Sequence, residues 1–315
     1  STLRTCLAQS TAANAVRTDA AVSSRGSMRS RADRLAEAAQ HEHASRVKPR
    51  TLLNVISRRA LLAFVAAATL ASLQGVPKAT PPPSATRVLF LGNSYTYVND
   101  LPALVRAFGR AAKPPRAIEF ECIAPGGCTL EMHAAEEGVR SPRARIADGK
   151  FDFVVLQEQS RRPLVDADAM LAAARALGTA IDAAKATPVW FATWAREKQL
   201  EEQDAITKSY EQCAVGVGGR VAPVGAAWKE VLTSKEKLRL HDEDGSHPNA
   251  AGSYLAALVI YATITGDDVD VLPAKLVETN ERGEERVLLD VPTKDAKLLR
   301  KAAAKALAAQ RAVKR

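Results

Sequence analysis

Residues 87–96 read RVLFLGNSYT, and the apolar run at their start indicates the type of fold. A strand with one face in water alternates apolar and polar residues, so the unbroken run RVLFLG predicts a strand buried on both faces. Similar short apolar stretches follow at 117–124, 152–157, 188–195 and 221–225. Helical patterns lie at 101–112, 165–186, 199–214, 226–232 and 248–264. Buried strands that alternate with helices predict an α/β fold, with a mainly parallel sheet and helices on both faces.

The segment after this sheet region has a pattern of its own. It predicts a short hairpin around Asn280–Gly283 and a helix rich in Ala and Lys from about residue 294. We expect this last helix to pack on the domain with its charged face in water.

Composition places the chain among globular proteins with a real core. It has 315 residues, of which 47% are hydrophobic and 25% charged, so a collagen-like, disordered or disulfide-dense class is excluded for most of it. The net charge is +9, but residues 1–80 hold 12 of the 44 Lys and Arg and only 4 of the 35 Asp and Glu. The remainder is nearly neutral, which does not indicate a nucleic-acid partner.

The basic N-terminal quarter is typical of an export signal. Arg58 and Arg59 precede an apolar stretch at 60–73, and small residues follow it. This is the order of a secretory signal, and about 14 apolar residues are too few to span a bilayer comfortably. We expect an exported protein, periplasmic or extracellular, with no stable membrane span after signal cleavage. The paired arginines resemble a twin-arginine signal, and an uncleaved membrane anchor is the alternative.

The four cysteines leave two interpretations open. Cys6 lies in the basic leader, and Cys122 and Cys128 could form a short-loop disulfide in an exported protein. With Cys213 the cysteines outside the leader number three, which is odd, so buried free thiols are the alternative to a disulfide. No cysteine spacing resembles a metal site.

Polar and glycine residues follow the first three predicted strands, where sites of parallel sheets lie. Ser94 comes directly after the first strand, and Gly92 permits a sharp turn that presents the serine oxygen outward. Gly126 and Gly127 follow the second strand and can bring a backbone N–H close to a ligand. Gln157 ends the third strand with an amide that can donate a hydrogen bond. Taken singly, each of these residues is also typical of an ordinary turn, helix cap or strand end without a catalytic role.

Asp244 and His247 lie in DGSHPNAAG, before the predicted helix at 248–264. A carboxylate three residues away can bond the imidazole N–H, fix its tautomer and stabilise the imidazolium. In isolation this pattern also suits a helix-entry loop. Together with Ser94 it indicates nucleophilic acyl transfer, in which nearby donors hold the carbonyl oxygen as it becomes negative.

These ordered motifs resemble the SGNH/GDSL hydrolase superfamily over residues 86–265. FLGNSYT is similar to its first block, with Asn93 where many members have Asp. GGCT is similar to the second block, and DGSHPNAAG is similar to the last. The resemblance implies a flavodoxin-like, three-layer α/β/α sandwich with a mainly parallel five-stranded sheet.

The resemblance also implies roles for residues. Ser94 becomes the nucleophile, His247 the base and Asp244 its acidic partner. The N–H groups of Ser94 and Gly127 fall at oxyanion-hole positions.

The third block departs from the superfamily pattern. Many members have Gly-x-Asn there, whereas residues 156–162 read LQEQSRR, which resembles a subset with Gln-Glu-Gln-Ser. We expect Gln157 to replace the asparagine as the third oxyanion donor because it ends the strand, and Gln159 is its rival.

The implied function is that of an exported serine esterase. It would cleave a short-acyl, most simply an acetyl, ester on a small molecule or carbohydrate through an acyl-enzyme, with no metal or organic cofactor. The alternatives are a lipase or thioesterase, and a non-catalytic glycan-binding protein on the same fold. The expected domain boundaries are a disordered or misassigned leader (1–56), a signal-like segment (57–75), a proline-rich linker (76–85) and a hydrolase-like domain with a C-terminal helical extension (86–315).

Two further polar residues near these motifs, His133 and Glu158, are expected to have structural rather than catalytic roles. His133 is expected on the surface of a helix, with the pocket lining as the alternative. Glu158 is expected to be a structural partner of Arg161 or Arg162 rather than an acid.

Strand alternation predicts that Trp190 and Trp194 share one face of the sheet as core residues, with Trp194 at the pocket rim as an option. His241 and Asp242 precede the catalytic loop, and we do not expect them to be a metal pair.

Overall fold

The computed structural model describes residues 84–236, 238–280 and 282–313. The predicted leader, signal-like segment and most of the linker lie outside this part of the chain, so the domain boundaries stay predictions. The elements in chain order are β1 (Thr86–Leu91), α3 (Ser94–Tyr97), η2 (Val98–Asp100), α4 (Leu101–Ala111), β2 (Ile118–Ile123), α5 (Leu130–Ala135), α6 (Pro142–Gly149), β3 (Phe153–Leu156), α7 (Arg162–Val165), α8 (Ala167–Ala183), β4 (Thr187–Phe191), η3 (Leu200–Glu202), α9 (Gln203–Val217), β5 (Arg220–Ala222), α10 (Val224–Leu232), α11 (Ala250–Thr265), β6 (Lys275–Thr279), β7 (Glu285–Asp290) and α12 (Thr293–Val313).

The five strands β1 to β5 form one sheet, and every pairing in it is parallel. Their order is β2-β1-β3-β4-β5, so the predicted five-stranded parallel sheet is confirmed. In this order the chain first adds β2 on one side of β1 and then β3 on the other. The carboxyl end of β1 therefore lies at the point where loops diverge to both sides, which is where sheets of this kind hold their ligands.

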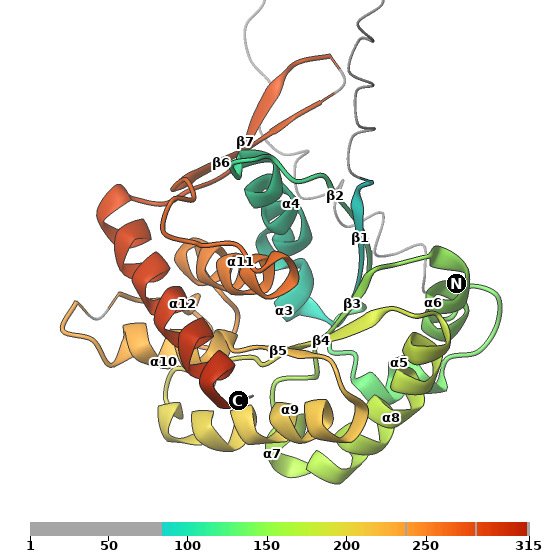
Figure 1. The fold of residues 1–315 in the computed structure, drawn as a ribbon. Coiled ribbons are helices and arrows are strands. Elements are labelled where there is room, and N and C mark those ends of the chain that lie inside the picture. Colours follow the sequence, from blue (N-terminus) through green and yellow to red (C-terminus); the bar gives the residue numbers. More distant parts are fainter. Residues whose placement is uncertain (1–83, 237, 281, 314–315) are drawn as a thin grey trace, which may run out of the picture. The chain divides into compact units, whose positions relative to one another are not determined.

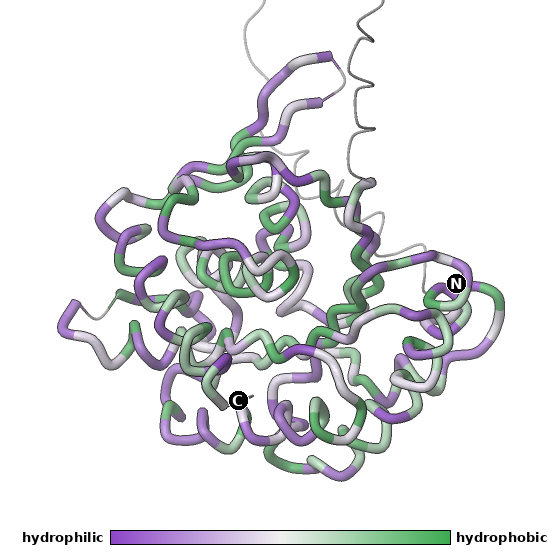
Figure 2. Tube along the Cα trace, viewed as in Figure 1, coloured by the Kyte–Doolittle hydropathy of each residue, from purple (hydrophilic) through white to green (hydrophobic). Residues whose placement is uncertain are grey.

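Two apolar layers cover the sheet, and alternate residues of β1 point into each. Val88 and Phe90 lie in the core shared with α4, α10, α11 and α12, whereas Leu89 and Leu91 lie in the core shared with α5, α6, α8 and α9. Figure 1 shows these two groups of helices on opposite sides of the strands. In Figure 2 hydrophobic residues gather along the central strands and hydrophilic ones on the outer faces of the helices.

Helix α11 is apolar around nearly its whole circumference, and it is buried accordingly. It contacts α4 on one side and α12 on another, and α12 also contacts α10. The helix and hairpin predicted after residue 265 are present as α12 and the β6–β7 ribbon. The C-terminal helix thus provides the cover that α11 requires, because a helix with no polar face must be enclosed.

The prediction that Trp190 and Trp194 share a face is wrong. Trp190 packs in the layer of α8 and α9, and Trp194 packs in the layer of α10 and α11. The reason is that β4 ends at Phe191, where the N–H of Ala192 bonds back to the carbonyl of Trp190 at 3.0 Å. Alternation holds only while the backbone is extended. Helix α6 is a further element that the sequence pattern did not predict.

Within the described residues no helix is both long enough and apolar enough to cross a membrane. Cys122 and Cys128 are thiols rather than a disulfide, and Cys128 and Cys213 are buried. Burial raises the pKa of the Cys128 thiol to about 11, so it is not a reactive thiolate at neutral pH.

Candidate active site

Two segments that are distant in sequence, the turn after β1 and the loop before α11, bring Ser94 together with His247 and Asp244 beyond the carboxyl end of β1. The hydroxyl of Ser94 donates to His247 Nε2 at 2.8 Å. His247 Nδ1–H donates to Asp244 Oδ2 at 2.5 Å. This is the arrangement that the sequence predicted for a nucleophile, a base and the acid that orients the base.

The loop around Asp244 is built to hold its carboxylate. Besides the imidazole, Asp244 Oδ1 accepts the backbone N–H groups of Ser246 and His247, each at 2.9 Å. The hydrogen bond from His247, followed by these two backbone bonds, lowers the pKa of Asp244 to about 2. The carboxylate is therefore ionised at neutral pH and can stabilise a positive charge on His247.

The backbone N–H groups of Ser94 and Gly127, the two predicted backbone oxyanion donors, have no role in the regular structure. Ser94 opens α3, so no earlier helical carbonyl is available to its N–H. Gly127 is the third residue of a turn closed by the Cys128 N–H and the Pro125 carbonyl, and its φ is +69°. A positive φ at this place defines a type II turn, which favours glycine and leaves the Gly127 N–H outside the turn's own hydrogen bond.

Asn93 joins the turn that carries Ser94 to the segments that follow β2 and β3. Its Nδ2 donates to the Cys128 carbonyl at 2.9 Å, which fixes the turn that carries Gly127. Its Oδ1 accepts Gln157 Nε2–H at 3.0 Å, and its own N–H donates to Gln157 Oε1 at 2.9 Å. The asparagine that replaces the usual aspartate thus pairs with the glutamine that replaces the usual asparagine.

The expectation that Gln157 donates to a substrate oxyanion is not supported by this geometry. Both hydrogens of its amide are in use, one on Asn93 Oδ1 and one on the carbonyl of Glu158 at 2.5 Å. Its Oε1 also accepts the Thr96 hydroxyl at 2.8 Å, and the residue is fully buried. A buried amide with every group satisfied supports its neighbours instead of meeting a ligand. The rival, Gln159, is half-buried, and its Nε2 makes one long bond of 3.4 Å to Ser160 Oγ.

Gly92 is required by the close approach of this network to β1. A Cβ at this position would lie 2.3 Å from Thr96 Oγ1 and 2.6 Å from Gln157 Oε1, both from buried, hydrogen-bonded side chains. The glycine of GNS is therefore fixed by packing as well as by the sharpness of the turn.

The prediction that His133 lies on the surface is wrong. The side chain is 1% exposed, and its Nε2–H donates to the Gly92 carbonyl at 2.9 Å. Burial lowers the pKa of His133, so the ring is neutral at neutral pH. A helix at His133 was expected, but α5 has only six residues, which is too short for a periodic pattern that would show which way the ring faces. His133 therefore holds the backbone of the turn that leads from β1 to Ser94.

Glu158 is structural, as expected, but its partners are backbone groups rather than an arginine. Its carboxylate accepts the N–H of Leu130 at 3.2 Å and the N–H of Gln159 at 2.6 Å, and Arg161 and Arg162 pair with other acids. The carboxyl is fully buried, and this burial raises its pKa to about 7. It therefore links the start of α5 to the end of β3.

This raised pKa predicts a pH-dependent stability that Glu158→Gln removes. Between the ordinary pKa near 4.5 and about 7 the folded protein binds more protons than the unfolded chain, so this group's contribution to stability is complete below pH 4.5 and is lost as pH rises through 7. We expect wild-type protein to lose on the order of 2 kcal/mol relative to Glu158→Gln between pH 5 and pH 8.

Urea unfolding of both proteins at the two pH values measures this difference. Because glutamine keeps the oxygen that accepts both backbone N–H groups, it mimics the protonated carboxyl. Parallel stability profiles for the two proteins would show that Glu158 does not titrate in this range.

An aromatic stack supports the imidazole. The Tyr95 ring packs edge-on to His247 with centroids 5.6 Å apart, and it stacks on Trp194 at 4.6 Å. Trp194 stacks in turn on Trp228 at 4.0 Å and donates its indole N–H to the Ser246 carbonyl at 2.9 Å. His247 is therefore held by packing against a stack of three aromatic rings as well as by the residues of its own loop.

His241 is a buried side chain that is held by a backbone carbonyl. It is buried, its Nε2–H donates to the Ala195 carbonyl at 2.9 Å, and burial lowers its pKa. Its neighbour Asp242 bonds the N–H of Glu243 instead of approaching it. His241 therefore holds the loop after β4 against the segment that leads to Asp244.

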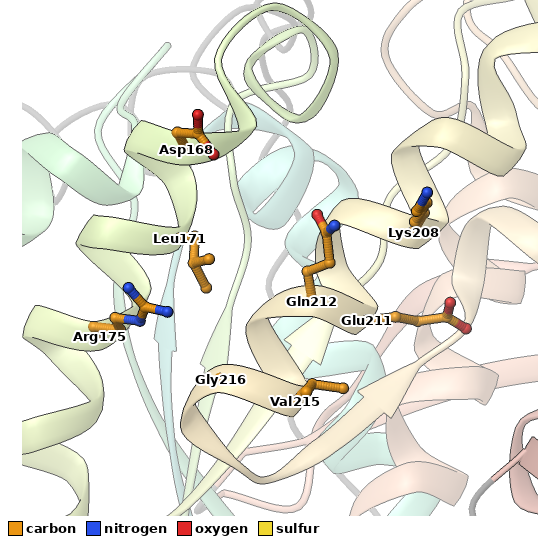
Figure 3. A pocket seen from close by; sticks show the side chains of 8 residues that line it. All are labelled: Asp168, Leu171, Arg175, Lys208, Glu211, Gln212, Val215 and Gly216. Carbon is orange, nitrogen blue, oxygen red and sulfur yellow. The ribbon is translucent and has the colours of Figure 1, made fainter.

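A shallow groove of about 400 Å³ lies elsewhere, between α8 and α9 (Figure 3). Its lining residues are Asp168, Leu171, Arg175, Lys208, Glu211, Gln212, Val215 and Gly216. None of them belongs to the segments that carry Ser94, Asp244 or His247, so the groove is not part of the candidate active site.

The parallel sheet, the serine at the end of β1 and the histidine loop before α11 define a protein of the hydrolase class. A protein from Slackia heliotrinireducens that is assigned to the SGNH hydrolases is 31% identical to this chain, with a TM-score of 0.50. The match covers 57% of this chain and 100% of that protein. The chain belongs to the SGNH hydrolase family.

A second solved structure supports the fold alone. A DUF4886 family protein from Bacteroides uniformis is 19% identical with a TM-score of 0.56, over 71% of this chain and 95% of that protein. No protein-family model matches the chain, and the search of curated proteins gave no match. Membership of the subset with a Gln-Glu-Gln-Ser third block stays a prediction.

Proposed function

We propose that the protein is a serine esterase that cleaves a short-acyl ester through an acyl-enzyme formed on Ser94. The observation that carries this proposal is the continuous hydrogen-bonded relay from Ser94 Oγ through His247 to Asp244, at 2.8 and 2.5 Å. A serine hydroxyl is a weak nucleophile until an adjacent base removes its proton, and this relay supplies the base and orients it.

The reaction follows from the relay. Ser94 Oγ forms a bond to the ester carbonyl carbon while its proton passes to His247 Nε2. The carbonyl oxygen becomes negative and accepts the N–H groups of Ser94 and Gly127. Collapse of this intermediate breaks the bond to the alcohol, which leaves with the proton from His247. Water then repeats the sequence on the acyl-enzyme and regenerates Ser94, and no step requires a metal or an organic cofactor.

We infer an acetyl or other short-acyl ester on a carbohydrate as the substrate class, in a protein that is exported. The openness of the site supports a large substrate that presents a small acyl group. The side chains of His247 and Asp244 are 35% and 48% exposed, so an ester on a bulky, polar alcohol can reach Ser94 from solvent. The export signal expected at 57–75 lies outside the described residues, so export rests on the sequence pattern.

A fluorophosphonate probe tests the nucleophile. We expect mass spectrometry of the treated protein to show one adduct, on Ser94, because the relay raises the nucleophilicity of that hydroxyl alone. His247→Ala should abolish the adduct while the protein stays folded. Absence of an adduct on folded wild-type protein would favour the non-catalytic glycan-binding alternative.

A further inference from the structure

Arg196 is a cation beside the candidate active site that has no acidic partner among the ion pairs of the described residues. It lies in the loop after β4, it is exposed, and its Nη2 donates to Ser160 Oγ at 3.2 Å. The acid next to it in sequence, Glu197, pairs with Arg239 at 3.1 Å. Arg161, at the start of α7, pairs with Glu202. These neighbouring arginines thus have acidic partners, whereas Arg196 has none in the part of the chain that the structure describes.

A chain of hydroxyl groups connects Arg196 to the catalytic imidazole. Ser160, which holds the guanidinium, also lies near the Tyr95 phenol, where it opposes the rise in the phenol's pKa that burial causes. The Tyr95 hydroxyl bonds Ser246 Oγ at 2.7 Å, and Ser246 is the residue before His247. The phenol ring itself lies edge-on to His247. Arg196 therefore belongs to the surroundings of His247. Gly127 follows β2 and Arg196 follows β4, which lie on opposite sides of β1 in the sheet, so Arg196 is on the side of the site away from the turn that carries Gly127.

Because Arg196 lies on the His247 side of the site, it would meet one particular part of the substrate. This step rests on the proposed function. His247 delivers its proton to the departing oxygen, so the alcohol part of the ester lies beside His247, and the carbonyl oxygen lies toward Gly127. A group on the alcohol part is then the one within reach of Arg196.

We propose that Arg196, with Ser160, Tyr95 and Ser246, forms a subsite for a carboxylate on the alcohol part of the ester substrate. A guanidinium carries five donors in a planar fork that matches a carboxylate, and the bond to Ser160 uses one of them. The hydroxyls of Ser160 and Ser246 add adaptable donors around the same place. The stacked column of Tyr95, Trp194 and Trp228 holds these groups at a fixed distance from His247.

Matched pairs of aryl acetates test this subsite. 3- and 4-acetoxybenzoate carry a carboxylate on the leaving alcohol, and 3- and 4-acetoxybenzamide are their neutral, nearly isosteric counterparts. We expect Arg196→Gln to lower kcat/KM for at least one acetoxybenzoate about 10-fold or more beyond its effect on the matching benzamide, because a charge-assisted hydrogen bond is lost. High salt should reduce the same ratio in wild-type protein.

Lys198→Gln is the control, because it removes one positive charge from the same exposed loop. It should leave the ratio of benzoate to benzamide unchanged. An equal loss for charged and neutral esters in Arg196→Gln, or no change in the ratio for either isomer, would overturn the subsite.

A binding measurement separates this proposal from the proposed function. On Ser94→Ala protein, NMR titration with the intact esters should show that the benzoate binds more tightly than the benzamide, and Arg196→Gln in the same background should remove the difference. If wild-type protein hydrolyses no ester but this preference is present, the esterase proposal fails and the carboxylate subsite stands. Equal binding of the two compounds overturns the subsite, whatever the activity.

Discussion

Replacing Ser94 with alanine is expected to lower kcat for a short-acyl ester by about 10⁴-fold or more, with the free energy of unfolding nearly unchanged. The side chain is half-exposed at the start of a four-residue helix, and its hydroxyl bonds His247, so little packing is lost. Turnover of an aryl acetate at substrate saturation measures the effect. Ser234→Ala, at the end of α10, is the control for a serine whose hydroxyl serves a helix terminus.

The companion change Asp244→Asn distinguishes the relay from a simple serine and histidine pair. An amide can present its N–H to His247 and select the wrong tautomer, so we expect kcat to fall about 10²–10⁴-fold. Because the carboxylate also accepts two backbone N–H groups, Asp244→Ala would disturb the loop as well. Wild-type turnover in Ser94→Ala or in Asp244→Asn would contradict the assignment of these residues.

Replacing Gln157 with leucine is expected to destabilise the protein and to impair catalysis together. Leucine has a similar size but leaves the N–H of Asn93 and the hydroxyl of Thr96 without an acceptor in a fully buried place. Unsatisfied buried groups cost about 1–3 kcal/mol each, so we expect a loss on the order of 3 kcal/mol by urea unfolding. Because Asn93 fixes the turn that carries Gly127, kcat should also fall about 10²-fold.

Gln159→Leu is the matched control for this change. Gln159 is half-buried, and its side-chain oxygen accepts one backbone N–H, from Arg161 at 2.8 Å, so a smaller loss of stability is expected. A fall in kcat near 10²-fold in Gln159→Leu without loss of stability would identify Gln159 as the oxyanion donor. The same result in Gln157→Leu would show that Gln157 contacts the transition state after all.

The fold was predictable because its decisive features are local in sequence. An unbroken apolar run such as 87–92 predicts a buried strand, and alternation with helices predicts a parallel sheet. The positions of Ser94, Asp244 and His247 were predictable for a related reason, since segments that follow parallel strands meet at one edge of the sheet. Their distances confirm that these segments meet.

The buried polar network was not predictable from the same patterns. Gln157 at a strand end could equally face a ligand or a neighbouring turn, and its choice depends on Asn93, 64 residues earlier. His133 depends on a helix of six residues that has no long periodic pattern. Arg196 could have been found, because it follows β4 just as Ser94 follows β1, but its lack of an acidic partner shows only when Glu197 and Arg239 are seen together.

Helix α11 begins three residues after His247, and its cap, Asn249, holds the carbonyl groups of Arg239 and His241. Because α12 covers the apolar surface of α11, the position of the His247 imidazole depends in part on the packing of α12. Natural and engineered variants are therefore under the same constraint, which is that α12 must keep covering α11. Substitutions on the exposed face of α12 are expected to be tolerated, whereas removal of α12 is expected to uncover α11 and so to shift the loop that carries His247.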